Sequence, residues 1–386
     1  MELYELIAPC HFGLEAVMKR EILDLGYEIE RVEDGKVTFL ADAEGIAYAN
    51  LFLRTTERIL LKVGQVHAET YDELFEATKA LPWEKFIPKN GKFWVTKANS
   101  IKSKLFSPSD IQSIMKKAIV ERLKQVYHME WFPEDGAQYP IRVSILKDEV
   151  MIGLDTSGVS LHKRGYRKLT AKAPITETLA AALIMLTPWK GDRILVDPFC
   201  GSGTFPIEAA MMAADIAPGL NRSFLAEQWT HLVPKKCWMD AAEDARYRIR
   251  NDIETDIQGF DIDGDVIKSA RENAKLAGVE KRCHFEVADV ADFAAKQEAI
   301  VLTNPPYGER MSTIEGAAKL ARTLGRQMEA HPCAGVYAIT ADMDFETHYG
   351  KRANKRRKMY NGMIPCQLYM YYNAPKFEHT AKPMPK

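Results

Sequence analysis

The pattern of apolar and polar residues changes near residue 170. Beyond it, short apolar runs typical of buried strands alternate with stretches whose apolar residues recur every three or four positions, as in helices. Such alternation predicts right-handed crossovers and a doubly wound, mostly parallel α/β sheet, which binds ligands at the carboxyl ends of its strands. The expected strands are "RILVDPF", "IQGFDID", "CHFEVAD" and "AIVLTNPP", and the expected helices are "TETLAAALIML", "FPIEAAMMAA" and "GDVIKSARENAKLAG".

The N-terminal part of the chain shows the pattern of two smaller α+β units. The first pairs the helical pattern "FGLEAVMKREILDLG", closed by Gly26, with the strand "GKVTFLA". In the second, a helix is expected to begin after Ser107, with Pro108 in its first turn and Asp110 completing a capping pattern. Its expected strands are "KFWVTKAN", "YPIRVSILKD" and "EVMIGLDTSG". The sequence therefore predicts domains over residues 1–64, 65–163 and 164–386.

Composition narrows the class of protein. The 386 residues are 46% apolar and 27% charged, as in a folded protein of two or three domains. No apolar run is long enough to span a bilayer and the acidic start "MELYELIAPCHFG" is not a secretion signal, so we expect a cytoplasmic protein. The six cysteines form no C-x-x-C pair, which argues against a zinc site and a disulfide framework, so no metal is expected.

A glycine-rich turn follows the first expected strand of the parallel sheet, in "DPFCGSGTFPIEAA". Gly201 and Gly203 permit a tight turn and a close approach by a ligand, and the next helix points its amides at that place. A dinucleotide fingerprint needs glycine or alanine where this chain has Pro206, so a nicotinamide oxidoreductase is the least favoured interpretation. Asp197 before the glycines and Pro198 after it leave no cradle for a pyrophosphate.

Two further carboxylates stand at the ends of the next strands. Asp261 in "GFDIDGDVI" can accept hydrogen bonds from both hydroxyls of a ribose, and Asp289 in "EVADVADF" can accept from an adenine amino group. Either aspartate alone is more often a cap or a turn, as we expect for Asp263. Together, at successive strand ends, they predict a site for a ribose-bearing adenine without a phosphate clamp, which is the shape of S-adenosylmethionine.

The stretch "VLTNPPYGERM" ends a strand abruptly, because two prolines cannot continue a sheet ladder. The nitrogen of a base amino group is a poor nucleophile, since its lone pair is delocalised into the ring. The Asn304 side-chain carbonyl and the Pro305 backbone carbonyl can accept the amino hydrogens, and Tyr307 can stack on the base. The competing interpretation is a structural turn with a packed tyrosine.

The order D-P-F-C-G-S-G-T, D-I-D, D and N-P-P-Y resembles the motif series of class I methyltransferases that modify exocyclic amines of nucleic acid bases. "LHKRGYRKLTAKAPITETLAAALI" and "RRKMYNGMIPCQLYMYY" further resemble bacterial ribosomal RNA guanine-N2 methyltransferases, in the stand-alone form of the large-subunit family. The resemblance implies a Rossmann-like methyltransferase domain preceded by ferredoxin-like and THUMP modules. It also implies S-adenosylmethionine as cofactor and a guanine 2-amino group in RNA as target.

The resemblance also assigns roles to residues within these motifs. The catalytic candidates are Asn304, Pro305, Pro306 and Tyr307. The cofactor candidates are Asp197, Pro198, Gly201, Gly203, Thr204, Asp261, Ile262, Asp289 and Asn304. Thr176 and Glu177 are further candidates for the methionine end of the cofactor, because in this family the segment before the first strand caps that pocket.

Three local basic runs are candidates for RNA contacts, although the formal net charge is only −1. Phosphate binding needs a local cationic surface, whereas a single run is usually just a solvated face. The last run is expected to form a hairpin between the final two strands. The RNA-binding candidates are Lys97, Lys102 and Lys104, then Lys163, Arg164 and Arg167, then Lys355, Arg356 and Arg357.

The sequence leaves several alternatives open. Adenine-N6 methylation, guanine methylation in transfer RNA and methylation of a glutamine side-chain amide share the N-P-P-Y chemistry. A different class is a non-enzymatic RNA-binding or ribosome-assembly factor, against which the intact Asp261 and Asn304 speak.

Overall fold

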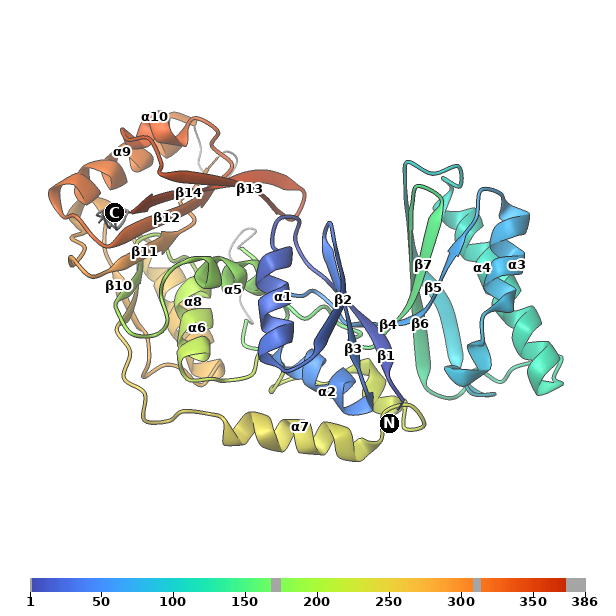
Figure 1. Ribbon diagram of the computed structural model, residues 1–386. Coiled ribbons are helices and arrows are strands. Elements are labelled where there is room, and N and C mark those ends of the chain that lie inside the picture. Colours follow the sequence, from blue (N-terminus) through green and yellow to red (C-terminus); the bar gives the residue numbers. More distant parts are fainter. Residues whose placement is uncertain (1, 168–174, 308–313, 373–386) are drawn as a thin grey trace, which may run out of the picture. The chain divides into compact units, whose positions relative to one another are not determined.

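The computed structural model describes residues 2–167, 175–307 and 314–372. Packing divides the chain into two compact units. Unit 1 comprises Met1–Lys168, Thr176–Leu186 and Met211–Ile253, and unit 2 comprises Leu169–Ile175, Thr187–Ala210 and Glu254–Lys386. Figure 1 traces the order of the elements by colour.

Unit 1 contains one continuous sheet of seven strands in the order β2-β3-β1-β4-β7-β6-β5. Strand β4 pairs antiparallel with both β1 and β7 and so joins two groups of strands that the sequence predicted as separate units. Strands β5 and β6 are parallel, and the other pairs are antiparallel. The strands are β1 (Tyr4–Pro9), β2 (Glu28–Glu33), β3 (Lys36–Ala41), β4 (Leu60–His67), β5 (Lys92–Ile101), β6 (Gln138–Leu146) and β7 (Glu149–Asp155).

The helices of unit 1 begin and end largely where the sequence places them. Ser107 caps α4 by accepting a hydrogen bond from the Asp110 amide at 3.4 Å, and Pro108 is its first residue. Helix α1 ends at Asp24, and Gly26 follows with a φ of +88°. The helices are α1 (Glu15–Asp24), α2 (Ala43–Phe52), α3 (Tyr71–Ala80), η1 (Trp83–Lys85), α4 (Pro108–Tyr127), α5 (Glu177–Leu186), η2 (Leu225–Gln228) and α7 (Lys235–Tyr247).

A segment that the sequence did not mark as separate, residues 211–253, packs with unit 1. Its helix α7 contacts α2, and Trp229 and Trp238 belong to the same hydrophobic core as the β1 and β3 side chains. The packing units therefore do not follow the expected boundary after residue 163. Packing units and sequence domains are different divisions, so the boundaries themselves stay a prediction.

Unit 2 contains the predicted doubly wound sheet, with the strand order β10-β9-β8-β11-β12-β14-β13. Strands β10, β9, β8, β11 and β12 are parallel, whereas β14 runs antiparallel to β12 and forms a hairpin with β13. The strands are β8 (Leu195–Asp197), β9 (Ile257–Asp261), β10 (His284–Val287), β11 (Ile300–Thr303), β12 (Gly335–Thr340), β13 (Lys355–Asn361) and β14 (Ile364–Tyr372).

Helices follow the parallel strands as expected. Asp263 caps α8 by accepting from the amides of Asp265 and Val266, which confirms the predicted cap. Gly325 lets α9 approach α10, because a Cβ at this position would lie 1.9 Å from the Tyr349 carbonyl oxygen. The helices are α6 (Thr204–Ala213), α8 (Gly264–Leu276), η3 (Val290–Asp292), α9 (Ile314–Ala330) and α10 (Phe345–Tyr349). Among the described residues, no helix is long and apolar enough to cross a bilayer.

Candidate active site

Four neighbouring strands of unit 2 bring the predicted site residues to one edge of the sheet. The order β10-β9-β8-β11 is parallel throughout, so the carboxyl ends of these strands lie side by side. Each strand end carries one predicted site residue. In the order of the strands these residues are Asp289 just after β10, Asp261 at the end of β9, Asp197 at the end of β8 and Asn304 just after β11. Residues separated by more than a hundred positions in sequence thus line a single edge, as predicted.

The glycine-rich turn is bonded to the end of β9. The Gly201 amide donates to Asp261 Oδ2 at 3.0 Å, and the Cys200 amide donates to the Phe260 carbonyl at 2.8 Å. Gly203 has a φ of +86°, and a Cβ there would lie 2.9 Å from the Phe285 ring. Gly201, at a φ of +54°, has no heavy atom within 4 Å of the position of a Cβ. Gly203 therefore serves close packing, and Gly201 borders open space that a ligand can fill.

Asp261 and Asp289 lie at the surface of this edge. Asp261 is partly exposed, and its Oδ1 accepts from the Asp263 amide at 3.0 Å. Asp289 is exposed and caps η3 by accepting from the Ala291 amide at 2.9 Å. Two apolar side chains beside them are open to solvent, Ile262 at 70% and Val287 at 51% exposure. Carboxylates beside exposed apolar side chains suit a ligand with a flat apolar part and polar edges.

Asp197 is only 2% exposed and has a different environment. Its Oδ1 accepts from the Thr303 hydroxyl at 2.6 Å and from the Phe199 amide at 3.1 Å. The carboxyl therefore connects the end of β8 to the residue directly before Asn304, and its burial leaves little of it for direct contact with a ligand. Pro198 and Thr204 are also buried. Thr303, which no sequence pattern singled out, is the partner that gives Asp197 this positioning role.

Burial raises the pKa of the Asp197 carboxyl from its ordinary 3.8 to about 7, and the nearby Asp261 carboxylate adds to this. The hydrogen bonds from Thr303 and Phe199 act in the opposite direction. The carboxyl holds its proton more tightly in the folded state than in the unfolded state. Protonated Asp197 therefore adds to the free energy of unfolding at low pH. This stabilisation is lost as the pH rises from about 4 towards 7.

We expect Asp197→Asn to be more heat-stable than the wild type at pH 8, with a smaller difference at pH 5. The asparagine oxygen can accept the same two hydrogen bonds but does not ionise, and each unit of pKa shift corresponds to about 1.4 kcal/mol. Thermal unfolding of both proteins at the two pH values measures this. A difference in Tm that does not change with pH would contradict the assignment.

The N-P-P-Y segment follows β11 directly. Asn304 is partly exposed and Pro305 is buried, so the amide lies at the surface on a fixed backbone. Tyr307 is 7% exposed, and its hydroxyl accepts a long hydrogen bond of 3.5 Å from the Asn361 side-chain Nδ2. The sequence gave no indication that Asn361, on the final hairpin, lies beside this segment. Residues 308–313, the continuation "GERMST", lie outside the described residues.

Thr176 and Glu177 stand at the start of α5, which belongs to unit 1 by packing. Glu177 is 3% exposed and its carboxylate pairs with the Arg167 guanidinium at 3.3 Å. Arg167, an RNA-binding candidate, therefore has a structural partner within its own unit.

The basic run at 163–167 is not a plain solvated face. Arg164 is 3% exposed, and its guanidinium donates to the carbonyls of Leu161 and Arg54. Little of Arg164 is left for an RNA contact, because its donors face the interior of unit 1, and its RNA-binding role stays a prediction. Lys163 remains exposed.

The other basic candidates lie mainly at the surface. Lys102 is exposed, and the exposed Lys104 pairs with Glu69. Lys97 belongs to β5, but its side chain lies outside the described part. The final run was expected in a hairpin between the last two strands. It lies instead largely inside β13, which itself forms the hairpin with β14.

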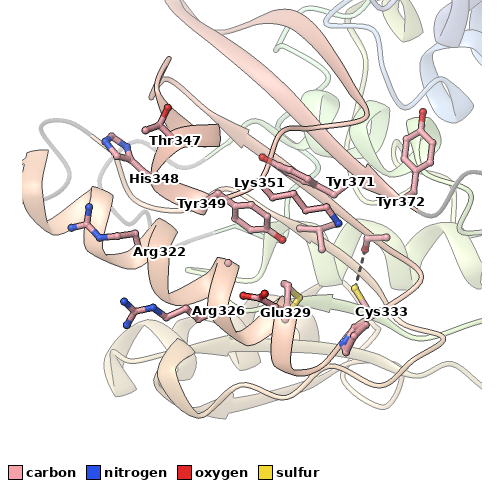
Figure 2. A pocket seen from close by; sticks show the side chains of 16 residues that line it. Arg322, Arg326, Glu329, Cys333, Thr347, His348, Tyr349, Lys351, Tyr371 and Tyr372 are labelled. Atoms are coloured by element: carbon pink, nitrogen blue, oxygen red, sulfur yellow. Dashed lines mark hydrogen bonds between the residues drawn. The ribbon is translucent and has the colours of Figure 1, made fainter.

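A cavity of about 600 Å³ lies elsewhere in unit 2. Gly335, the first residue of β12, and its pairing partner Tyr372 line it, so it sits at the amino end of β12. Figure 2 shows Arg322, Arg326 and Glu329 on α9 at its border. The carboxyl ends that carry the predicted site lie at the other edge of the sheet, so this cavity is separate from that site.

Comparison with known families agrees with this architecture. Residues 164–370 match the family described as "RMKL-like, methyltransferase domain", which is more than half of the chain. Residues 5–60 match the "RlmL ferredoxin-like domain" and residues 68–155 the "THUMP domain". The chain belongs to the RMKL-like methyltransferase family. The predicted fold class, a Rossmann-like methyltransferase domain preceded by ferredoxin-like and THUMP modules, is confirmed.

Individual relatives are similar over nearly the whole chain. "Putative RNA methyltransferase YpsC" from Bacillus subtilis is 45% identical, over 97% of each chain. "Ribosomal RNA large subunit methyltransferase K/L" from Syntrophotalea carbinolica is 33% identical over 92% of this chain but only 52% of its own length. This chain thus spans about half of that relative.

Similar solved structures indicate which cofactor this fold binds. "SMU.472, a putative methyltransferase complexed with SAH" is 40% identical with a TM-score of 0.90, covering 97% of this chain and 99% of its own. A "predicted N6-adenine-specific DNA methylase" from Listeria monocytogenes is 45% identical with a TM-score of 0.90, covering 97% of each chain. S-adenosylmethionine is the cofactor of this methyltransferase fold, as predicted. The open space at Gly201 and the partly exposed Asp261 fit such a ligand.

Proposed function

We propose that this protein transfers a methyl group from S-adenosylmethionine to the exocyclic 2-amino group of a guanine in large-subunit ribosomal RNA. The observation that carries the proposal is the position of Asn304-Pro305-Pro306 at the end of β11, in the same row of strand ends as Asp261 and Asp289. An acceptor for amino hydrogens thereby borders the place where the cofactor would bind. The names of the K/L and YpsC relatives support an RNA substrate.

The cofactor would be held by the edge formed from β8, β9 and β10. The Asp261 carboxylate would accept from the ribose hydroxyls, Asp289 from the adenine amino group, and the exposed Ile262 and Val287 would contact the adenine faces. When bound, the cofactor supplies an activated methyl group on a sulfonium, so no nucleophilic side chain is required. Gly201 leaves room for its close approach.

The target amino group would be held by the N-P-P-Y segment. Asn304 Oδ1 and the Pro305 carbonyl would accept its two hydrogens, which localises the nitrogen lone pair toward the methyl donor. The prolines fix φ at two successive positions, so the acceptors need little reorganisation. Asp197, through Thr303, holds the end of β11 to β8 and thus helps to fix Asn304.

A base must leave its stack to reach such a site. Tyr307 would contact the base, although with 7% exposure it offers only part of its ring in this structure.

The domain division at 1–64, 65–163 and 164–386 belongs to the proposal and is supported by the matched ranges. Exposed Lys102 and Lys104 would contact phosphates from the THUMP domain, and the 80% exposed Phe106 nearby can stack on a base.

Adenine-N6 methylation is the second candidate. Asn304 and Pro305 can accept hydrogens from an adenine amino group equally well, and the name of the Listeria relative mentions adenine. The names of the K/L relatives favour ribosomal RNA as the substrate but name no base, so the preference for guanine rests on the motif resemblance.

The β13 cations should contribute to RNA affinity. Lys355 and Lys358 are exposed, so Lys355→Glu/Lys358→Glu should weaken RNA binding. The slope of log affinity against log salt should also fall, by roughly 0.7–0.9 for each phosphate that the variant no longer neutralises. Filter binding at several salt concentrations measures both. Lys275→Glu/Lys281→Glu is the matched control, since both lysines are also exposed and precede the start of β10. Equal behaviour of the two variants would assign the β13 run to solvent.

The function is tested with RNA from a strain that lacks the gene. Large ribosomal, small ribosomal and transfer RNA fractions are each incubated with the protein and methyl-labelled S-adenosylmethionine. We expect label in the large ribosomal fraction. Cofactor binding without label in any fraction would refute RNA methylation and favour a protein substrate or an assembly factor.

A further inference from the structure

The tip of the β13–β14 hairpin carries three apolar side chains that are open to solvent: Met363 at the turn, Ile364 on the same face as its partner Asn361, and Tyr360 on the opposite face. Asn361 pairs with Ile364, so only Gly362 and Met363 form the turn. Gly362 has a φ of +64° and Met363 has no positive φ, as in a type II′ turn, whose twist suits a tight hairpin. Met363 is 96% exposed, and Tyr360 and Ile364 beside it are 44% and 43% exposed.

Three large apolar side chains within five residues are unusual on a surface, where such side chains normally occur singly. We call Tyr360, Met363 and Ile364 the hairpin tip. The turn needs glycine only at Gly362 and accepts a polar residue at Met363, so the turn itself does not require an apolar side chain at that most exposed position. The tip is therefore a candidate for contact with a ligand.

The position of the tip relates it to the proposed target site. Asn361, which directly precedes the turn, places its amide nitrogen 3.5 Å from the Tyr307 hydroxyl. Tyr307 ends the N-P-P-Y segment, so the hairpin tip begins one side chain away from the place where the base would be held. Both residues belong to unit 2, so this neighbourhood is internal to one compact unit.

The rest of the hairpin carries positive charge, as a surface that contacts nucleic acid phosphates requires. Lys355 and Lys358 on β13 are exposed, and Arg356 is 45% exposed on its side chain while paired with Glu346 at 3.2 Å. A cationic strand that leads to an apolar tip matches an RNA strand, whose phosphates lie outside and whose bases stack inside. A protein partner or a lipid surface would give no reason for the tip to adjoin Tyr307.

We propose that the hairpin tip inserts into the RNA at the position that the target base vacates. This inference rests on the proposed function and adds how the base is extracted. Taking a base out of a helix breaks its stacking and pairing, at a cost of a few kcal/mol. Apolar side chains that enter the vacated step, as in proteins that kink nucleic acids, replace part of the broken stacking. Met363 has a flexible side chain suited to an irregular gap, and Tyr360 can stack on a neighbouring base.

The test compares Met363→Ser/Ile364→Ser with the wild type on two forms of the RNA that the wild type methylates. In one form the target base is paired, and in the other it stands opposite an abasic site, so that little extraction is needed. We expect kcat/KM of the variant to fall about tenfold or more on the paired target and less than about twofold on the other, since insertion replaces a few kcal/mol of stacking. A 2-aminopurine beside the target should also show less unstacking with the variant.

Met239→Ser is the matched control, since Met239 is 69% exposed on α7 of unit 1. Unchanged Tm and unchanged affinity for S-adenosylhomocysteine verify that the tip variant is folded. An equal decrease on both RNA forms, or no decrease on either, would overturn the insertion while the proposed function stands. If the wild type methylates no RNA in the fractionation experiment above, the proposed function fails, and the insertion with it.

Discussion

Replacing Asn304 by alanine is expected to lower kcat by about 100- to 1000-fold, the range seen when one preorganised polar group is removed from an active site. The side-chain oxygen would hold an amino hydrogen of the base as the lone pair turns toward the methyl donor. Affinity for S-adenosylhomocysteine should change by no more than a few-fold, because the ribose and adenine contacts are proposed for β9 and β10. Single-turnover methylation and a calorimetric titration measure the two quantities.

Asn304→Asp is the informative comparison. It keeps an oxygen acceptor at the same distance from the backbone, so it should retain more activity than Asn304→Ala. Both variants should keep the Tm of the wild type, because Asn304 is partly exposed. Turnover of Asn304→Ala at the wild-type rate would show that the assigned role of this amide is wrong.

The second large effect is expected for Asp261→Ala, in cofactor affinity. The bonds from the Asp261 carboxylate to the ribose would be removed, and the Gly201 and Asp263 amides would be left without this acceptor. Hydrogen bonds to a charged group contribute about 1.5–3 kcal/mol, which corresponds to roughly 10- to 100-fold weaker binding. Titration with S-adenosylhomocysteine measures this directly.

Asp265→Ala is the matched control for this variant. Asp265 is exposed, lies four residues further on at the start of α8 and pairs with Lys268 at 2.9 Å. Its removal should leave cofactor affinity nearly unchanged. If both variants bind the cofactor as the wild type does, the ribose lies elsewhere and the β9 end has only a structural function.

The part of the site that could be predicted from the sequence depends on local signals. Closely spaced glycines, consecutive prolines and the apolar pattern of each single strand or helix are visible within short stretches of the chain. Since parallel strands end at one edge, these local signals were sufficient to bring Asp261, Asp289 and Asn304 into one row. Helix caps at Ser107 and Asp263 followed from the same kind of short-range rule.

The contacts that were missed join residues far apart in sequence. The Thr303 hydroxyl reaches Asp197 across 106 positions, and Asn361 approaches Tyr307 across 54. Nothing in either short segment indicates its partner. The continuous sheet of unit 1 was missed for the same reason, since β4 has no pattern that shows it pairing on both sides.

Charge patterns were the least reliable signal. Arg164 stands in a run of cations that is typical of a solvent-exposed face, yet the carbonyls of Leu161 and Arg54 bind its guanidinium in the interior. The local sequence does not show whether an arginine is exposed or is buried with carbonyl partners. By contrast, the exposed cations of β13 keep the surface position on which their proposed function depends.

The most direct test of the central claim is the identity of the methylated nucleoside. RNA labelled by the wild-type protein is digested to nucleosides and separated by mass spectrometry, with Asn304→Ala as the inactive control. The proposal predicts N2-methylguanosine in the wild-type product and its absence in the control. Label in N6-methyladenosine would contradict the guanine assignment, and label that persists in the control would contradict the role of Asn304.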